Sequence, residues 1–492
     1  AGESPDMNLL FPLTYAAVVG EEGSLPVDVT GGGRWEQGSL IIENLLFTSG
    51  KSQVRVTGTV TDPPNFNGTR LSVKGDIADA STLKGLLHRH LPAAPARISL
   101  TAIGKGPELQ VSDLAITLGV SDIEGDFRFR YQEPATFQGR FKSRLIDVTA
   151  LLPPPPDTGA GAPPDLERKR ATRKRDERLI PETPIPVDFL AGTAADVTLD
   201  IDQLRLDAHT LREVFVDAAL HDSRLAVRDF HFSADRGGRL RGYGSLAADG
   251  GKGILKLSVA GEGLSFGFPA SNAEELQKLP QYNLEAVLQA DGATVREMAG
   301  RANGYFMIDA GKGRIRASGF RLLTNDFFYE LFTALNPFAI RDDYSKLNCA
   351  GLSSGIKDGQ MVGKPFLVSS TDRVNVYADA SINLRRETLN VTFNTVPQKG
   401  LGFSLSTLIN PYIKLSGTLA DPVLSINPEQ SLISGTATVV TGGLNIVARG
   451  LKDRFMSGRD PCRRSQREQT GYLQALRETY GQPGLEPPSP SS

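Results

Sequence analysis

A serine in a Gly-x-Ser-x-Gly pattern is the first residue in this sequence that suggests chemistry. Residues 351–355 read Gly-Leu-Ser-Ser-Gly, the pattern of a nucleophilic serine on a sharp turn between a strand and a helix. The next residues, 356–359, predict a strand and a hairpin turn in place of that helix. The fold that uses this motif also needs a later histidine, and the last histidine of the chain is His231. A hydrolase at Ser353 is therefore the least favoured hypothesis.

Other groups of reactive residue types are weaker. His221, Asp222 and Ser223 are adjacent, and neighbours on a strand point to opposite faces, so they cannot form a proton relay. His88 and His90 could share one face of a strand, but no cysteine or carboxylate cluster accompanies them to make a metal site. We expect no catalytic residue, no metal and no cofactor, and a protein that binds and carries rather than catalyses.

Cys349 and Cys462 are the two cysteines of the chain. In an oxidising compartment they could pair, which would tie the basic C-terminal segment to the preceding strands. Closing so long a loop would stabilise the fold by up to about 4 kcal/mol. In a reducing compartment they would be buried thiols. The sequence leaves both states open.

The elements that position these residues follow a period of two. Apolar and polar residues alternate in several segments, and this pattern predicts strands with one apolar and one polar face. The candidates for a lipid-binding lining on the apolar face are Val54, Val56, Val60, Leu199, Ile201, Leu255, Leu257, Val259, Leu389, Val391, Phe393, Ile413, Leu415 and Leu419. A sheet with one apolar face must cover it; closure into a barrel, packing as a sandwich and filling by acyl chains remain open.

Turn and helix signals complete the pattern. Hairpin turns are predicted at Asn67-Gly68, Asp249-Gly250, Asp291-Gly292, Asn303-Gly304 and Asp358-Gly359. The best helix candidate is residues 325–335, with shorter candidates at 80–90, 273–279 and 472–480. The spacing predicts a mainly β, antiparallel fold with a few short helices.

Length and charge set the organisation of the chain. It has 492 residues and a formal net charge of −2, and this balance argues against a nucleic-acid partner. Residues 168–178 and 449–467 each carry a net charge of +5. We expect these segments to be either solvated loops or contacts to anionic lipid headgroups. A Pro-rich run divides the chain into an N-terminal β block (1–151), a Pro-rich and basic linker (152–183), a C-terminal β block (184–458) and a basic, Pro/Ser-rich tail (459–492), which is partly disordered.

Several segments resemble the C-terminal region of AsmA-like proteins of diderm bacteria. The segments that carry the resemblance are Leu347-Asn348-Cys349-Ala350, Ile356-Lys357-Asp358-Gly359, residues 374–394, Thr395-Val396-Pro397, Asn410-Pro411-Tyr412, residues 415–422, Asp460-Pro461-Cys462 and, upstream, residues 184–190 and 195–199. The resemblance covers nearly the whole chain and is most specific after Pro184.

The resemblance implies an elongated, curled antiparallel β-sheet that forms an open groove or partial barrel, as in bridge-like lipid-transfer proteins. It implies a periplasmic protein held in the inner membrane by one N-terminal helix. The most apolar stretch near the start, residues 9–19, has about half the roughly 20 residues that a spanning helix needs. We therefore expect that anchor to be absent from this chain.

Two functions follow as expectations. The first is a non-enzymatic envelope protein that carries phospholipids between the inner and outer membrane through an apolar β groove and contributes to outer-membrane homeostasis. Its partners would be phospholipid, the two membrane surfaces and other envelope proteins. The alternative is a periplasmic scaffold or assembly factor for outer-membrane proteins, which would use exposed strand edges.

Overall fold

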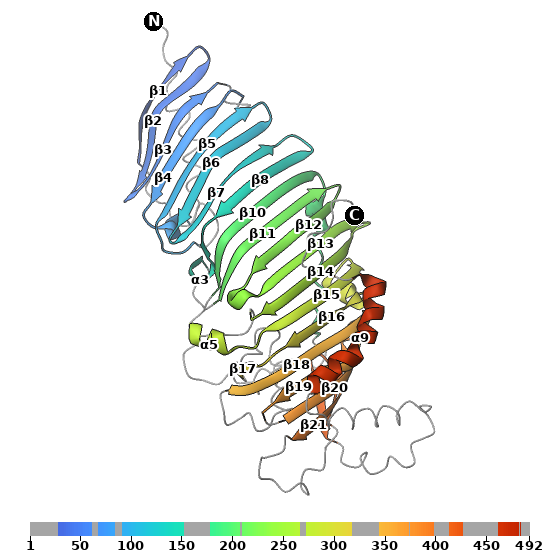
Figure 1. Ribbon diagram of the computed structural model, residues 1–492. Helices are drawn as coiled ribbons and strands as arrows, with labels where there is room; N and C mark the ends of the chain where they lie inside the picture. The colour runs from blue at the N-terminus through green and yellow to red at the C-terminus, as the bar shows by residue number, and fades with distance from the viewer. Residues whose placement is uncertain are drawn as a thin grey trace, which may run out of the picture. The chain divides into compact units, whose positions relative to one another are not determined.

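A computed structural model of the chain describes residues 28–61, 67–83, 91–151, 178–206, 209–265, 272–316, 344–372, 374–397, 413–426, 461–481 and 483. The described residues form two compact units. The first consists of residues 1–162 with 189–232, and the second of residues 163–188 with 233–492. In each unit the strands form an open, curled, mainly antiparallel sheet with few short helices (Figure 1), so the expected fold class is confirmed.

The first unit begins as an antiparallel meander. Each strand from β1 to β8 pairs antiparallel with the next. These strands are β1 (Asp28–Glu36), β2 (Ser39–Ser49), β3 (Ser52–Val60), β4 (Arg70–Ile77), β5 (Ala96–Lys105), β6 (Glu108–Leu118), β7 (Ser121–Arg130) and β8 (Ala135–Ser143). The short helical turn η2 (Ala80–Leu83) lies between β4 and β5.

The meander changes direction after β8. β10 (Thr193–Leu206) runs parallel to β8 and to the short β9 (Ile146–Asp147), and antiparallel to β11 (His209–His221). A parallel pair needs a crossover connection, and residues 148–192, which include α3 (Val148–Leu151) and η3 (Val187–Leu190), provide it. The Pro-rich run lies within this crossover, so the strand after it pairs directly with the strands before it. The unit ends in β12 (Arg224–Ser233).

The second unit repeats the meander. Its strands are β13 (Arg239–Asp249), β14 (Lys252–Leu264), β15 (Tyr282–Gly292), β16 (Asn303–Ala310), β17 (Gly313–Arg316), β18 (Tyr344–Lys357), β19 (Gln360–Thr371), β20 (Val374–Asn383), β21 (Thr388–Pro397), β22 (Ile413–Thr418) and β23 (Pro422–Ile426). Successive strands pair antiparallel, except that β16 and β17 each pair with β18. The short turn η4 (Asp235–Gly237) precedes β13.

Helices in the second unit agree in part with the sequence. The helix expected at 273–279 is α5 (Ala273–Lys278), capped by Asn272 Oδ1, which accepts from Glu275 N at 2.9 Å. The helix expected at 472–480 is the last part of the longer α9 (Pro461–Tyr480). A further short helix, α6 (Val295–Gly300), links β15 to β16. The expected helix at 325–335 lies outside the described residues, as do residues 84–90 of the candidate at 80–90.

Two of the predicted hairpin turns are wrong. Asp358-Gly359 and Asp249-Gly250 do join consecutive strands, and Gly359 and Gly250 have positive φ. Asp291-Gly292 instead ends β15 ahead of α6, and Asn303-Gly304 opens β16. Gly304 has a φ of 139°, and a Cβ there would lie 2.0 Å from Val287 O of β15. Glycine is required there because two strands approach closely, and no turn is involved.

Candidate functional site

In the first unit, one face of the sheet carries apolar side chains from strand to strand. Strand register places the predicted residues Val54, Val56 and Val60 of β3, and Leu199 and Ile201 of β10, on this face. The apolar residues directly opposite them are Leu40, Leu45, Phe47, Val73, Phe141, Val214 and Val216. Ile201 is buried, whereas the other four predicted residues are only half-buried. The face is therefore apolar but partly open.

The opposite face of the same strands is polar. Arg55 of β3 lies between Val54 and Val56 and is exposed, and it pairs across the strands with the exposed Lys74. Asp200 of β10 is exposed in the same way. This alternation of exposed charges and half-buried apolar residues is the period of two predicted by the sequence.

The second unit has an apolar face of the same kind. Leu255, Leu257 and Val259 of β14 lie opposite Ala290, Leu288 and Ala286 of β15. Further along the meander, Leu389, Val391 and Phe393 of β21 lie opposite Ile382, Ala380 and Ala378 of β20. On the other side of β21, Leu415 lies opposite Val391, and Ile413 opposite Phe393. On each of these strands, the predicted residues therefore lie in one row on the apolar face of the sheet.

Burial along this face is uneven. Phe393 is 1% exposed and lies in a buried cluster with Leu389, Val391 and Leu415, against which Leu419 packs. Leu257 of β14, by contrast, is 40% exposed. Near β14 the apolar face therefore remains open to solvent, and around β21 it forms a core. An exposed large apolar side chain within a continuous apolar face marks a binding surface more often than chance.

α6 covers the edge of the apolar face at which β14 begins and β15 ends. Met298 of α6 packs with Ala290 and Ile356, and Ile185 packs against the same cluster. The helix start is fixed by Thr294, whose Oγ1 accepts from Glu297 N at 3.2 Å. This edge is therefore closed by a capped helix.

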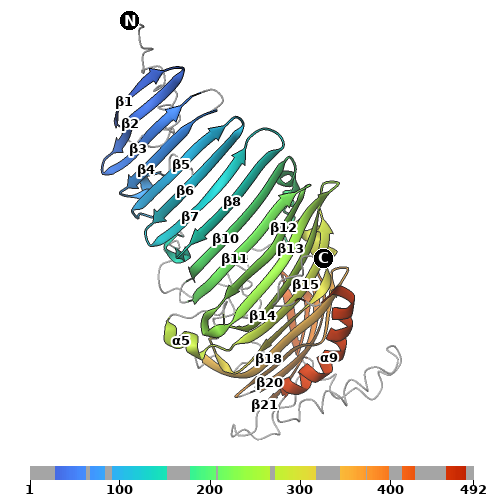
Figure 2. The ribbon, with the colours of Figure 1, turned by 45° about the horizontal axis from the view of Figure 1, so that its top comes forward.

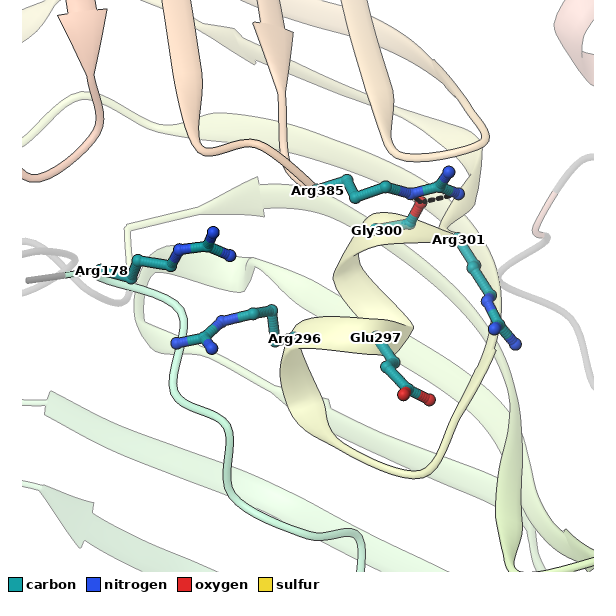
Figure 3. A pocket seen from close by; sticks show the side chains of 6 residues that line it. All are labelled: Arg178, Arg296, Glu297, Gly300, Arg301 and Arg385. Carbon is teal, nitrogen blue, oxygen red and sulfur yellow. Dashed lines mark hydrogen bonds between the residues drawn. The ribbon is translucent and has the colours of Figure 1, made fainter. Parts of the chain in front are cut away.

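An arginine-rich cleft lies on the other side of α6. We call it the arginine cleft; its volume is about 470 Å³, and it is lined by Arg178, Arg296, Glu297, Gly300, Arg301 and Arg385 (Figure 3). Arg296 donates to Glu182 Oε2 at 2.6 Å and to Ile180 O at 3.1 Å. Arg301 donates to Asp291 Oδ2 at 2.8 Å, and the pKa of Arg301 is raised by this hydrogen bond.

A buried carboxylate holds the segment that carries Arg178. Glu387, the last residue of the turn before β21, is 2% exposed. Its Oε2 accepts from Leu179 N at 2.6 Å and from Ile180 N at 3.3 Å. Its Oε1 lies 3.7 Å from Arg296 Nε. This carboxylate therefore fixes Arg178 next to α6, although the two parts are about 200 residues apart in sequence.

α9 packs on one face of the sheet, and Leu288 with the candidate apolar row lies on the other face. The helix lies against β16, β18 and β19 (Figure 1), and Figure 2 shows it beside β18 from a second direction. Its Leu476 and Tyr480 pack against Val287 and Tyr305, which point to the face opposite Leu288. The longest described helix therefore leaves the candidate apolar face uncovered.

Both ends of α9 are fastened. Cys462 forms a disulfide with Cys349 of β18, with 6.2 Å between their Cα atoms. Near the other end, Arg477 Nε donates to Glu285 Oε1 at 2.9 Å, and this contact raises the pKa of Arg477. Tyr305 Oη donates to the same carboxylate, and burial together with that carboxylate raises the pKa of the Tyr305 hydroxyl.

The other residues singled out in the sequence do not form a catalytic site. Ser353 lies inside β18, is 2% exposed, and its hydroxyl donates to Pro365 O at 3.3 Å. It lacks the exposed turn that a nucleophilic serine needs. His221 Nε2 lies 3.0 Å from Asp196 Oδ2, while Asp222 and Ser223 form the next turn. His88 and His90 lie outside the described residues.

Within the described ranges, no group of three or more His, Cys, Asp or Glu side chains is placed to hold a metal ion. No helix among those residues is both long and apolar enough to cross a membrane.

No protein-family model and no curated protein matches the chain.

The sequence did not point to the arginine cleft or to the buried Tyr305–Glu285–Arg477 group. The positive charge of residues 168–178 was the one available signal for the cleft, because Arg178 is its last residue. The other members come from α6 and from the turn before β21, and no local pattern connects them.

Proposed function

We propose that this protein is a non-enzymatic carrier that binds the acyl chains of phospholipids on its half-exposed apolar face. The observation that carries the proposal is Leu257, which is 40% exposed in the middle of an otherwise apolar row of β14. Contiguous exposed apolar surface marks sites that a ligand, a membrane or a partner protein covers, and acyl chains are the ligand that fits an apolar row with few polar groups.

The free energy gained by burying acyl chains on this face is large enough to hold a lipid. Burial of acyl chains contributes about 0.8 kcal/mol per methylene, so one long chain gains on the order of 10 kcal/mol. The apolar lining has few polar groups to select a headgroup. It therefore suits transport of a lipid class more than recognition of one molecule.

The cellular setting is part of the proposal. With the AsmA-like resemblance of the C-terminal strands, we place the protein in the periplasm, held at the inner membrane, where it moves phospholipid between inner and outer membrane and supports outer-membrane homeostasis. The Cys349–Cys462 disulfide supports an oxidising compartment.

A pair of matched variants tests the proposal. Leu257→Asp puts a charge on the apolar face, whereas Tyr243→Asp puts one on a residue of equal exposure, 39%, on the opposite face of the neighbouring strand. Purified protein is delipidated and incubated with labelled phospholipid, and the bound lipid is measured. We expect loss of lipid uptake in Leu257→Asp and normal uptake in Tyr243→Asp. Absence of uptake by the wild-type protein would refute the proposal.

The scaffold function has one observation in its favour. Within the described residues, β1 pairs only with β2, and β23 pairs only with β22. Each leaves an edge on which a partner strand can add. A proline placed in β1, at Val29, would weaken partner binding but not lipid uptake if the edge serves a scaffold.

A further inference from the structure

We infer that the arginine cleft is a binding site for a phosphate group, with Arg178 and Arg385 as its two main ligands. The inference rests on the proposed lipid function only for the source of that phosphate, which is a phospholipid headgroup. The cleft lies entirely within the second unit, so the residues that form it are placed together by one compact body.

The first argument is the pairing of charges. Arg296 and Arg301 each have a carboxylate partner, Glu182 and Asp291 respectively. Within the part of the chain that the structure describes, neither Arg178 nor Arg385 has a carboxylate within ion-pair distance. Two guanidinium groups that line one cleft without a carboxylate partner match the charge of one phosphate group, for which arginine is the preferred side chain.

Second, hydrogen bonds hold the Arg385 side chain and the backbone beside Arg178 next to α6. Arg385 donates its Nε–H and Nη2–H to Gly300 O at 3.2 and 2.9 Å, which leaves Nη1 for a ligand (Figure 3). The same contact satisfies the carbonyl at the end of α6, which would otherwise repel an anion. Arg178 is placed by the hydrogen bonds of Leu179 and Ile180 to Glu387. Ligand binding therefore costs little ordering of the Arg385 side chain, whereas only the backbone beside Arg178 is held and the Arg178 side chain still loses rotamer freedom.

The third argument is the size and place of the cleft. A volume of about 470 Å³ exceeds that of a bare phosphate ion and suits a phosphorylated headgroup. The cleft shares α6 with the apolar face, because Met298 of α6 packs on that face while Arg296 and Arg301 line the cleft. A lipid whose chains lie on the apolar face has its phosphate at this edge of the sheet.

Titration with glycerol phosphate tests the site without a membrane. The purified chain in a phosphate-free buffer is titrated with glycerol phosphate and with inorganic phosphate, followed by calorimetry. Arg178→Gln removes a ligand whose side chain makes no hydrogen bond or ion pair in the described structure. Arg386→Gln is the matched control, because Arg386 is exposed, carries the same charge and lies next to Arg385 but outside the cleft. Arg385→Gln is the second variant, with its folding checked by thermal unfolding.

We expect glycerol phosphate to bind at least about tenfold more weakly to Arg178→Gln, because a charge-assisted hydrogen bond is lost, and equally well to Arg386→Gln. Equal affinity of wild type, Arg178→Gln and Arg385→Gln would overturn the site. So would equal weakening by Arg386→Gln, since the effect would then be one of net charge.

Uptake of labelled phosphatidylglycerol from vesicles separates the two proposals. If Leu257→Asp abolishes uptake while Arg178→Gln leaves both uptake and glycerol phosphate binding unchanged, the cleft inference fails and the carrier function stands. If glycerol phosphate binds in an Arg178-dependent manner but the wild-type protein takes up no lipid, the carrier function fails. The site then serves a free phosphorylated molecule.

Discussion

Tyr305 donates its hydroxyl hydrogen to Glu285 Oε1 at 2.5 Å, and the same carboxylate binds Arg477 of α9. Tyr305 also lies 3.0 Å from Gly481 O, just after α9 ends. A buried tyrosine, a buried carboxylate and a half-buried guanidinium thus join β15, β16 and the C-terminal helix. Loss of the Tyr305 hydroxyl leaves Glu285 paired with Arg477 but without one of its hydrogen bonds in a poorly hydrated place.

Tyr305→Phe is therefore expected to loosen α9. The free energy of unfolding should fall by about 1–3 kcal/mol, since a hydrogen bond to a buried charge is lost. Amide hydrogen exchange should become faster in α9. Tyr472→Phe is the control, because Tyr472 is an exposed side chain whose hydroxyl makes a long contact, 3.4 Å, to Val362 O. Equal exchange in wild type and Tyr305→Phe would contradict the role given to this group.

Cys462→Ser is expected to release the other end of α9. The disulfide closes a loop with a sequence separation of 113 residues. Its loss should lower the free energy of unfolding by about 4–5 kcal/mol in the chain-entropy account. Chemical denaturation measures this loss. Cys349→Ser/Cys462→Ser should equal the single variant, and a further loss in the double variant would show that Cys349 stabilises the fold in some other way.

Truncations along the apolar face should differ in cost. Phe393→Ala should cost about 3–5 kcal/mol, because Phe393 is 1% exposed in a packed cluster. Leu257→Ala should cost about 1 kcal/mol or less, because that side chain is 40% exposed. Both are read from denaturant unfolding. A large cost for Leu257→Ala would show that the face around β14 is closed, which removes the basis of the carrier function.

We expect the Asp122 carboxyl to make the stability of the first unit depend on pH. Burial by itself raises the pKa of this carboxyl, but hydrogen bonds from Leu145 N, Arg144 and Ser143 outweigh burial and lower the pKa below 3.8. A lowered folded-state pKa means that the stabilisation is complete above the unfolded value and is lost as the pH falls through the folded value. Asp122→Asn should therefore be less stable than wild type at neutral pH by about 2–4 kcal/mol.

The difference between wild type and Asp122→Asn should shrink as the pH falls below about 4. Unfolding of both proteins by urea across this range measures it. A difference that stays constant at acid pH would mean that the carboxylate charge does not stabilise the unit.

Much of the fold follows from local sequence. The alternation in residues 54–60 or 389–393 predicts a strand and also which residues share a face, because successive side chains of a strand point to opposite sides. The cap at Asn272 and the Asp358-Gly359 turn are likewise local signals, since each depends on the backbone of a few neighbouring residues.

Where a local sequence pattern predicted the wrong structure, a contact with a residue outside that pattern determined the backbone conformation. Asn303-Gly304 has the composition of a turn but lies in a strand, because β15 passes so close that only glycine fits. The Gly-x-Ser-x-Gly pattern likewise became the interior of β18, covered on its Ser353 side.

The sequence by itself determined that this protein is a β meander with one apolar and one polar face, since both depend on the alternation within each strand. Only the tertiary structure decided how much of that face stays open, because burial of Leu257 or Phe393 depends on which distant strands and helices reach them. It alone also placed Arg178 with Arg385 and Tyr305 with Arg477. Their partners are more than one hundred residues away, and contacts at that separation leave no periodic signal in the chain.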